Sequence, residues 1–132
     1  MAEGKPNFST RVLVVDDEPD ILYVCEKALE KQYLVSGFSS PEDALEHFKA
    51  HCAAVDLVLT DVRMPTMSGF ELAREIRMLR KDIPIVFMSA HEIVHGEYES
   101  AFPAAEGIRV LSKPFNLSTL AQFISKHATS RE

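Results

Sequence analysis

Short apolar runs alternate along the chain with segments in which apolar residues recur at helical spacing. The first run, Val12–Val15, is continuously apolar, which is typical of a strand covered on both faces. Further strands are expected at Tyr33–Phe38, Val55–Thr60, Ile83–Met88 and, more briefly, Val110–Leu111. This alternation predicts an α/β domain with a parallel sheet and helices on both of its faces.

Capping residues and prolines mark the expected starts of the helices. Pro19 suits the first turn of the first helix, and Pro41 suits that of the second, which Ser40 would cap. Ser68, with Glu71 three residues later, has the spacing of a capping box. The apolar faces of the third and last helices are expected to consist of Leu72, Ala73, Ile76 and Leu79, and of Leu117, Leu120, Ala121 and Ile124.

The segment between the fourth and fifth strands has the weakest periodicity. A helix from about Glu92 to Ala101 fits the pattern, but Pro103 would end or distort it. The surface formed by this segment is therefore the least defined part of the predicted fold.

Length and charge narrow the classes of function. The 132 residues fit a single domain, with a core expected from about residue 11 to residue 127 and terminal extensions at 1–10 and 128–132. Twenty acidic against 14 basic residues give a net charge of −6, which weighs against nucleic acid or an anionic membrane as a direct partner. No apolar run approaches the roughly 20 residues that a membrane span needs.

The cysteines indicate a reducing compartment. Cys25 and Cys52 form no CxxC pattern, and the polar segment Met1–Thr10 lacks the apolar core of a signal peptide. We therefore expect two reduced thiols in a cytoplasmic protein, rather than a disulfide between them.

Polar residues follow four of the predicted strands at their carboxyl ends. Asp16 and Asp17 end the first strand, Asp61 the third, Ser89 the fourth and Lys113 the fifth. Ligands of open parallel sheets bind at this edge, near the point where the strand order reverses. The five side chains are therefore expected to converge on one site, although they are spread over most of the chain.

The chemistry of these residues points to a metal ion and a phosphoryl group. Three clustered carboxylates repel one another unless a cation lies between them, and all-oxygen ligands suit Mg²⁺, with Mn²⁺ as a substitute. A carboxylate beside this cation, the Lys113 ammonium and the Ser89 hydroxyl is suited to attack on phosphorus, which forms an aspartyl phosphate. Singly, the same residues also fit helix-capping, turn or surface roles, which do not explain their joint placement.

Four motifs at these strand ends carry a family resemblance. They are Val14-Val15-Asp16-Asp17-Glu18, then Thr60-Asp61-Val62-Arg63-Met64-Pro65 with Ser68-Gly69 behind it, then Ser89-Ala90, and finally Lys113-Pro114-Phe115. In this order the motifs resemble the receiver domain of response regulators in two-component signalling, over about residues 11–126. The resemblance implies a flavodoxin-like (βα)5 fold, with a five-stranded parallel sheet in the order 2-1-3-4-5.

The resemblance implies a role for each acid at the metal. Asp17 and Asp61 would bind Mg²⁺ directly, together with the backbone carbonyl of Arg63. Asp16 would hold a metal-bound water. Asp61 would also be the phosphoacceptor.

It further implies how the phosphoryl group is held. Ser89 and Lys113 would each bind one phosphoryl oxygen, and the Lys113–Pro114 peptide bond is expected to be cis. Many receivers carry an aromatic residue three positions before this lysine, but Val110 stands there in this chain. The aromatic readout of the family is therefore not expected here.

The function implied is that of a switch rather than an enzyme, with only self-phosphorylation and slow self-dephosphorylation. The donor would be a sensor histidine kinase or a histidine phosphotransfer protein. Output would pass through a partner protein, or a tethered domain outside these residues, with the receiver as a monomer or a phosphorylation-dependent dimer.

One competing motif belongs to a different class of protein. His91-Glu92-Ile93-Val94-His95 matches HExxH, the zinc-peptidase signature, but Tyr98 replaces the glycine of the extended motif. The alternative is therefore a zinc metallopeptidase-like site, which would need a third ligand and a substrate cleft. His47, His51 and His127 are expected to be exposed helical residues.

Overall fold

The computed structural model describes residues 10–89, 108–112 and 117–127. Its strands are β1 (Arg11–Val15), β2 (Leu34–Phe38), β3 (Leu57–Asp61), β4 (Ile85–Ser89) and β5 (Ile108–Ser112). All neighbouring strands are parallel, and their order is β2-β1-β3-β4-β5. The predicted flavodoxin-like sheet and its strand order are confirmed.

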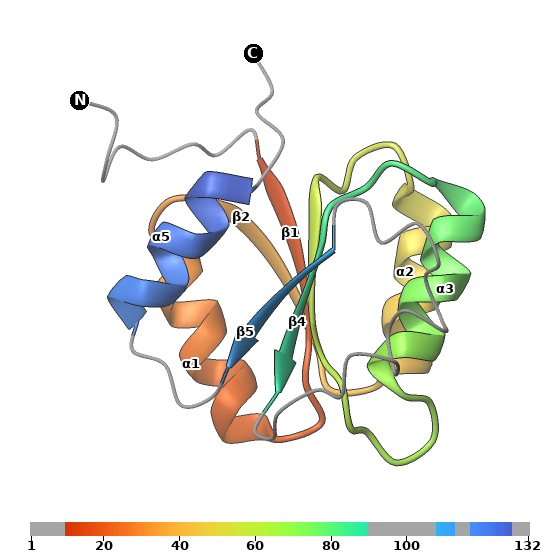
Figure 1. Cartoon of the computed structure of the whole chain (residues 1–132), viewed down its shortest axis with the longest axis horizontal. Coiled ribbons are helices and arrows are strands. Elements are labelled where there is room, and N and C mark those ends of the chain that lie inside the picture. The colour runs from red at the N-terminus through yellow and green to blue at the C-terminus, as the bar shows by residue number, and fades with distance from the viewer. Residues whose placement is uncertain (1–9, 90–107, 113–116, 128–132) are drawn as a thin grey trace.

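The described helices cover both faces of this sheet. They are α1 (Pro19–Leu29), α2 (Pro41–His51), α3 (Gly69–Leu79) and α5 (Leu117–His127). Figure 1 shows α1 and α5 together on one side and α2 and α3 together on the other. The helix expected at residues 92–101 lies outside the described residues.

The helix starts follow the predicted capping signals. Pro41 opens α2, and the Ser40 Oγ accepts a hydrogen bond from the Asp43 N–H at 3.2 Å. At α3 the capping box is complete: the Ser68 Oγ accepts from the Glu71 N–H at 3.1 Å, and the Ser68 N–H donates to Glu71 Oε1 at 2.9 Å. The two serines thus satisfy backbone donors that a helix start leaves without intrahelical partners.

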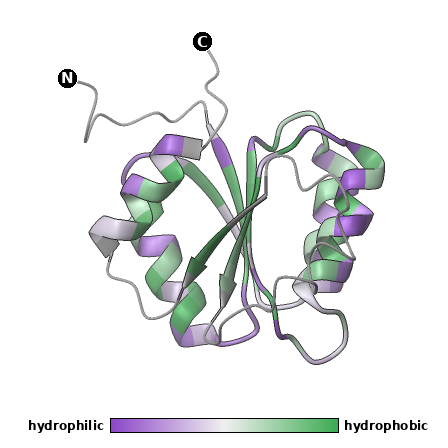
Figure 2. Cartoon of the chain, in the orientation of Figure 1, coloured by the Kyte–Doolittle hydropathy of each residue, from purple (hydrophilic) through white to green (hydrophobic). Residues whose placement is uncertain are grey.

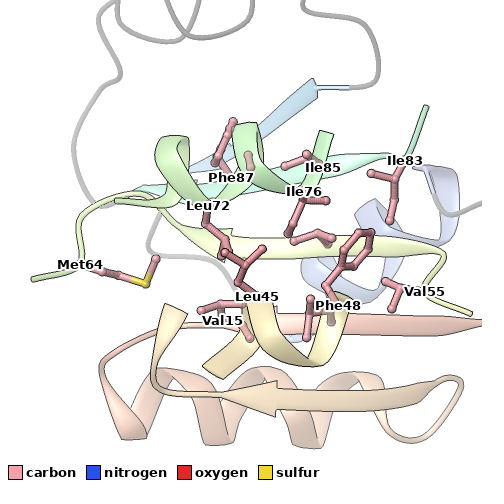
Figure 3. Close-up of a cluster of buried hydrophobic side chains, with 14 of the residues drawn as sticks. Val15, Leu45, Phe48, Val55, Met64, Leu72, Ile76, Ile83, Ile85 and Phe87 are labelled. Atoms are coloured by element: carbon pink, nitrogen blue, oxygen red, sulfur yellow. The ribbon is translucent and has the colours of Figure 1, made fainter. Parts of the chain in front are cut away.

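The sheet separates two apolar layers, and successive residues of β1 contribute to opposite ones. Leu13 and Val15 pack toward α2 and α3, in the layer that Figure 3 draws. Val12 and Val14 pack toward α1 and α5. Figure 2 shows the same division, with hydrophobic strands between helices whose hydrophilic residues are mostly on their outer sides. Burial on both faces explains why the strands are continuously apolar.

Several details differ from the prediction; for example, β4 begins at Ile85 rather than Ile83. β3 begins at Leu57 rather than Val55, although Asp56 still binds the start of β1: its N–H donates to the Arg11 carbonyl at 2.8 Å, and its Oδ2 accepts the Arg11 N–H at 2.8 Å. Leu79, expected on the buried face of α3, is 46% exposed because it is the last residue of the helix.

The thiols lie on opposite sides of the sheet, as expected of cysteines that form no disulfide. Cys25 is buried in the layer under α1, with its Sγ 3.8 Å from Met88 Sδ. Cys52 follows α2, and its Sγ lies 3.9 Å from the carbonyl oxygen of Leu79. Among the described residues, no helix combines the length and apolar character needed to cross a membrane.

Candidate functional site

Three carboxylates meet where β1 and β3 end side by side. The two strands pair in parallel with Val15 opposite Thr60, so Asp16 and Asp61 occupy the next position on each strand path. One carboxylate oxygen from each of Asp16, Asp17 and Asp61 lies within 4.8 Å of the others. The strand order reverses between these two strands, so the cluster occupies the switch point of the sheet.

Asp16 is held on its backbone and on its side chain. Its N–H donates to the carbonyl of Phe38 at the end of β2, at 3.1 Å. Its Oδ1 accepts the Glu18 N–H at 2.9 Å, which turns the chain toward α1. The residue is fully buried, whereas Asp17 is half-buried.

Asp61 is fixed by the strand that carries it and by the start of α3. It pairs in register with Met88, and the Val62 N–H donates to the Met88 carbonyl at 3.2 Å. The Thr60 hydroxyl donates to the Asp61 carbonyl at 3.0 Å. The Asp61 side chain is thereby presented at the edge of the sheet with 7% of the residue exposed.

Gly69 is a positioning residue that the sequence analysis quoted only as part of a motif. Its N–H donates to the Val62 carbonyl at 2.8 Å, which brings the start of α3 against the end of β3. A Cβ atom at this position would overlap the backbone carbonyl oxygen of Asp61. The available signal was a glycine just after a helix cap, where a residue with a stronger helix propensity would be expected.

The loop from β3 to α3 is also tied to α2. The Thr66 side chain hydrogen-bonds the Glu42 carboxylate, and this bond is the main reason that the pKa of Glu42 lies below its ordinary value. Arg63 lies in the same loop, two residues beyond Asp61, with an exposed side chain. The loop that carries the expected carbonyl ligand therefore has contacts to α2 and, through Gly69, to α3.

The remaining predicted residues are only partly described. Ser89 is the last residue of β4, next to β3, and its backbone pairs in register with Ser112 of β5. The Ser89 side chain, Lys113 and the Lys113–Pro114 bond lie outside what the structure describes. The same is true of the HExxH segment at 91–95.

Val110 lies on the side of the sheet that faces α2 and α3. It pairs in register with Phe87 and packs, half-buried, against the apolar layer on that side. The Phe87 ring meets the Phe70 ring edge-on, with centroids 4.9 Å apart. Aromatic contacts near this part of β5 are therefore supplied by β4 and α3, while β5 contributes an aliphatic side chain.

The donor set of the cluster fits a hard cation. Carboxylate oxygens are the ligands that Mg²⁺ prefers, and the spacing of the three oxygens lets one small ion or its bound waters reach all of them. Without a cation, three carboxylates this close repel one another across a partly dehydrated pocket. The residues present therefore fit the Mg²⁺ that the resemblance implies.

Comparison with known proteins assigns the family. The family model of the response regulator receiver domain matches residues 12–125. The chain belongs to the response regulator receiver family. The matched residues include nearly all of the described strands and helices. The chain is therefore a signalling domain of two-component systems.

Three relatives show that such receivers occur in proteins of different kinds. The chain is 36% identical over 117 residues to the response regulator receiver protein CpdR of Brucella abortus, covering 88% of this chain and 94% of CpdR. It is 34% identical over 119 residues to the sensor kinase CckA of the same organism, covering 89% of this chain but 12% of CckA. It also spans 21% of ARR14, a two-component response regulator of Arabidopsis thaliana.

Solved structures agree with the fold of the receiver. The chemotaxis protein CheY4 of Vibrio cholerae has a TM-score of 0.77 at 30% identity, over 89% of this chain and 98% of that chain. The response regulator TrrA of Thermotoga maritima, in complex with Mg²⁺ and BeF, has a TM-score of 0.74 at 34% identity, over 89% and 97%. The acidic cluster therefore lies in a domain whose architecture is that of known receivers.

Proposed function

We propose that this receiver is switched by phosphorylation of Asp61, with Mg²⁺ bound in the acidic cluster. The observation that carries the proposal is the convergence of Asp16, Asp17 and Asp61 within 4.8 Å at the switch point of the sheet. Of the three, Asp61 is the one that ends a strand, and its backbone is held by Thr60 and α3. A nucleophile gains most from such fixed placement.

The proposed metal ligands divide between the two strands. Asp17 and Asp61 would bind Mg²⁺ directly, with the Arg63 carbonyl as a third ligand, and Asp16 would hold a metal-bound water. When bound, Mg²⁺ offsets the charge of the carboxylates and of an incoming phosphoryl group. The TrrA structure, a complex with Mg²⁺ and BeF, supports this assignment by analogy.

The transfer step uses few protein groups. An Asp61 carboxylate oxygen attacks the phosphorus of a phosphohistidine, the phosphorus–nitrogen bond breaks, and its electron pair leaves with the imidazole. Ser89 and Lys113 are proposed to bind the phosphoryl oxygens. Attack of water on the acyl phosphate later releases inorganic phosphate and restores the Asp61 carboxylate, so the domain acts as a switch rather than an enzyme with a separate substrate.

The proposed partners follow from the family. A sensor histidine kinase or a histidine phosphotransfer protein would donate the phosphoryl group, and the relative CckA is itself a sensor kinase. Output would pass to a partner protein or a tethered domain. We propose that residues 1–132 form one receiver unit, either monomeric or dimerising on phosphorylation. No comparison supports the zinc-peptidase alternative.

Intact-mass measurement after incubation with acetyl phosphate and Mg²⁺ tests this proposal. The expected result is addition of one phosphoryl group, lost in Asp61→Asn and in the presence of a chelator. Asp82→Asn is the matched control, because Asp82 has an 87% exposed side chain after α3, away from the cluster. Labelling that persists in Asp61→Asn would refute the site.

A further inference from the structure

A second pocket lies at the other end of β1 and contains only basic titratable side chains. Its volume is about 230 Å³, and it is lined by β1, β2, α2 and the start of the next loop. The polar side chains in its lining are those of Arg11, Ser36, His47 and His51. Among the described residues, no carboxylate lines it, although the whole sequence carries a net charge of −6.

The parallel register explains why these residues meet. Arg11 and Leu13 point to the same side of β1, and Leu13 lies opposite Ser36 on β2. His47 and His51 are one helical turn apart on α2, which packs on that side. Their rings lie 4.6 Å apart between centroids, so both imidazoles share the wall of the pocket.

The charges around His47 are predominantly positive. On α2 its neighbours one turn away are Asp43 and His51, Arg11 approaches from β1, and β2 has no titratable residue. Burial lowers the pKa of His47, and repulsion from His51 and Arg11 lowers it further. A bound anion would lower this positive potential and is therefore expected to be stabilised beside His47.

Arg11 keeps its guanidinium available to this pocket. The carboxylate of Asp56 is beside it, but this carboxylate accepts the backbone N–H of Arg11 at 2.8 Å. Within the described ranges, no carboxylate forms an ion pair with the Arg11 side chain. The planar fork of a guanidinium is well suited to bind two oxygens of an oxyanion.

We propose that this pocket binds a small oxyanion, of the class of phosphate, its monoesters or a dicarboxylate. Arg11 provides the fixed positive charge, the two imidazoles provide N–H donors, and the Ser36 hydroxyl provides a fourth donor. The volume lies below the roughly 300 Å³ of pockets for drug-sized ligands, which favours a small ligand. The site is separate from the acidic cluster and does not depend on phosphorylation of Asp61.

The proposal can be tested by titrating the protein with sulfate and following the imidazole resonances by NMR. The titration is run at about pH 6, where a histidine is partly protonated. Ionic strength is kept constant with sodium chloride, and Mg²⁺ is omitted. Saturable shifts of His47 and His51 are expected, with binding weakened about fivefold or more in Arg11→Gln. Because the protonated imidazole pairs with the anion, sulfate should also raise the measured pKa of His47.

Lys49→Gln is the matched control, because it also removes one positive charge, here from α2, but Lys49 does not line the pocket. The Lys49 Nζ lies 3.9 Å from Glu46 Oε2 on the same helix. Sulfate binding should survive unchanged in Lys49→Gln and in Asp61→Asn, and a changed affinity in Asp61→Asn would place the sulfate near the acidic cluster instead. Glycerol phosphate and succinate then distinguish esters and dicarboxylates from the free ion. Shifts that never saturate, equal weakening in Lys49→Gln, or an unchanged His47 pKa would overturn the proposal.

Discussion

Gly69 allows the start of α3 to approach the backbone of Asp61. In Gly69→Ala the new methyl group would overlap the Asp61 carbonyl oxygen, and a backbone atom cannot move aside as a flexible side chain can. We expect a loss of about 1–3 kcal/mol in the free energy of unfolding, measured by urea denaturation. We also expect slower phosphorylation by acetyl phosphate, because displacing the Asp61 backbone displaces the proposed nucleophile.

Gly37→Ala is the control for this substitution. Its methyl group would meet the far end of the Glu26 side chain, which can rotate away. The loss should stay below about 1 kcal/mol. An equal loss of unfolding free energy in the two variants would show that a side chain at position 69 can be accommodated beside the Asp61 backbone.

His47 gives the stability of the domain a pH dependence. Its pKa lies below the ordinary value of 6.5, mainly because of burial, so the folded chain binds this proton more weakly than the unfolded chain. Its contribution is therefore unfavourable at low pH: stability falls as the pH drops through 6.5 toward the folded-state pKa. Urea denaturation at about pH 7.5 and about pH 5.5 should show a smaller decrease for His47→Gln than for wild type.

Lys49→Gln should keep the wild-type decrease, because a lysine does not titrate in this range. Acids elsewhere in the chain contribute equally to wild type and variant, so the difference between them isolates His47. An identical pH dependence in wild type and His47→Gln would contradict the lowered pKa.

At the scale of the element, the capping box links the start of α3 to the loop that follows Asp61. Ser68→Ala removes the hydrogen bond from the Glu71 N–H and should lower the free energy of unfolding by about 0.5–2 kcal/mol in urea denaturation. Glu71→Ala removes the reciprocal bond to the Ser68 N–H. The double variant should lose less than the sum of the two single losses, because the bonds support one helix turn.

Additive losses in this double-mutant cycle would show that the two bonds act independently. Ser40→Ala provides a comparison at α2, where the serine accepts the Asp43 N–H. Ser40→Ala should also be destabilising, because it removes the corresponding cap of α2.

Most elements were predictable because local signals and packing agree in them. The capping serines and the apolar strands carry their own signatures. The errors occur at the ends of elements: Asp56 precedes β3 and hydrogen-bonds both backbone groups of Arg11, and Leu79 is exposed where α3 ends. His47, expected to be exposed, is half-buried because β1 and β2 pack against its side of α2. The contacts of Asp56 with β1 and of His47 with β1 and β2 cannot be read from residue spacing along one helix or strand.

At the scale of the whole molecule, the acidic cluster is expected to lower the stability of the fold when no cation is bound. Three carboxylates within 4.8 Å repel in the absence of a cation, so Asp61→Asn should melt at a higher temperature than wild type without Mg²⁺. Mg²⁺ should raise the melting temperature of wild type, because an ion that binds only the folded chain stabilises it. Each kcal/mol of stabilisation corresponds to about 3–5 °C for a domain of this size. Circular dichroism at matched ionic strength measures both effects.

Asp82→Asn controls for the change in net charge and should behave as wild type does. An equal response to Mg²⁺ in Asp61→Asn would show that the ion acts elsewhere. A lower melting temperature of Asp61→Asn without Mg²⁺ would show that contacts of Asp61 outweigh the repulsion.

The acidic part of the site was predictable because one topological rule places all strand ends of a parallel sheet at one edge. That rule needs only the positions of Asp16, Asp17 and Asp61 relative to the strands. It says nothing of the residues that hold the acids in place. The role of Gly69 was missed because it depends on the close approach of α3 to the end of β3. The role of Thr60 was missed because it rests on a bond from its hydroxyl to the Asp61 carbonyl, which residue spacing does not show.

Only the correct pairing of β1 with β3 assembles the acidic cluster, so the cluster exists only in the folded domain. Two of the three acids come from residues 16–17 and the third from residue 61, so only the aligned strands bring them together. A slip of one residue between these strands would turn the Asp61 side chain to the other face of the sheet. A nascent chain that ends before Leu57 contains two of the three acids and none of the strand that carries the third. If Asp61 is the phosphoacceptor, as proposed, a misregistered or unfinished domain would lack the assembled site and could not be phosphorylated.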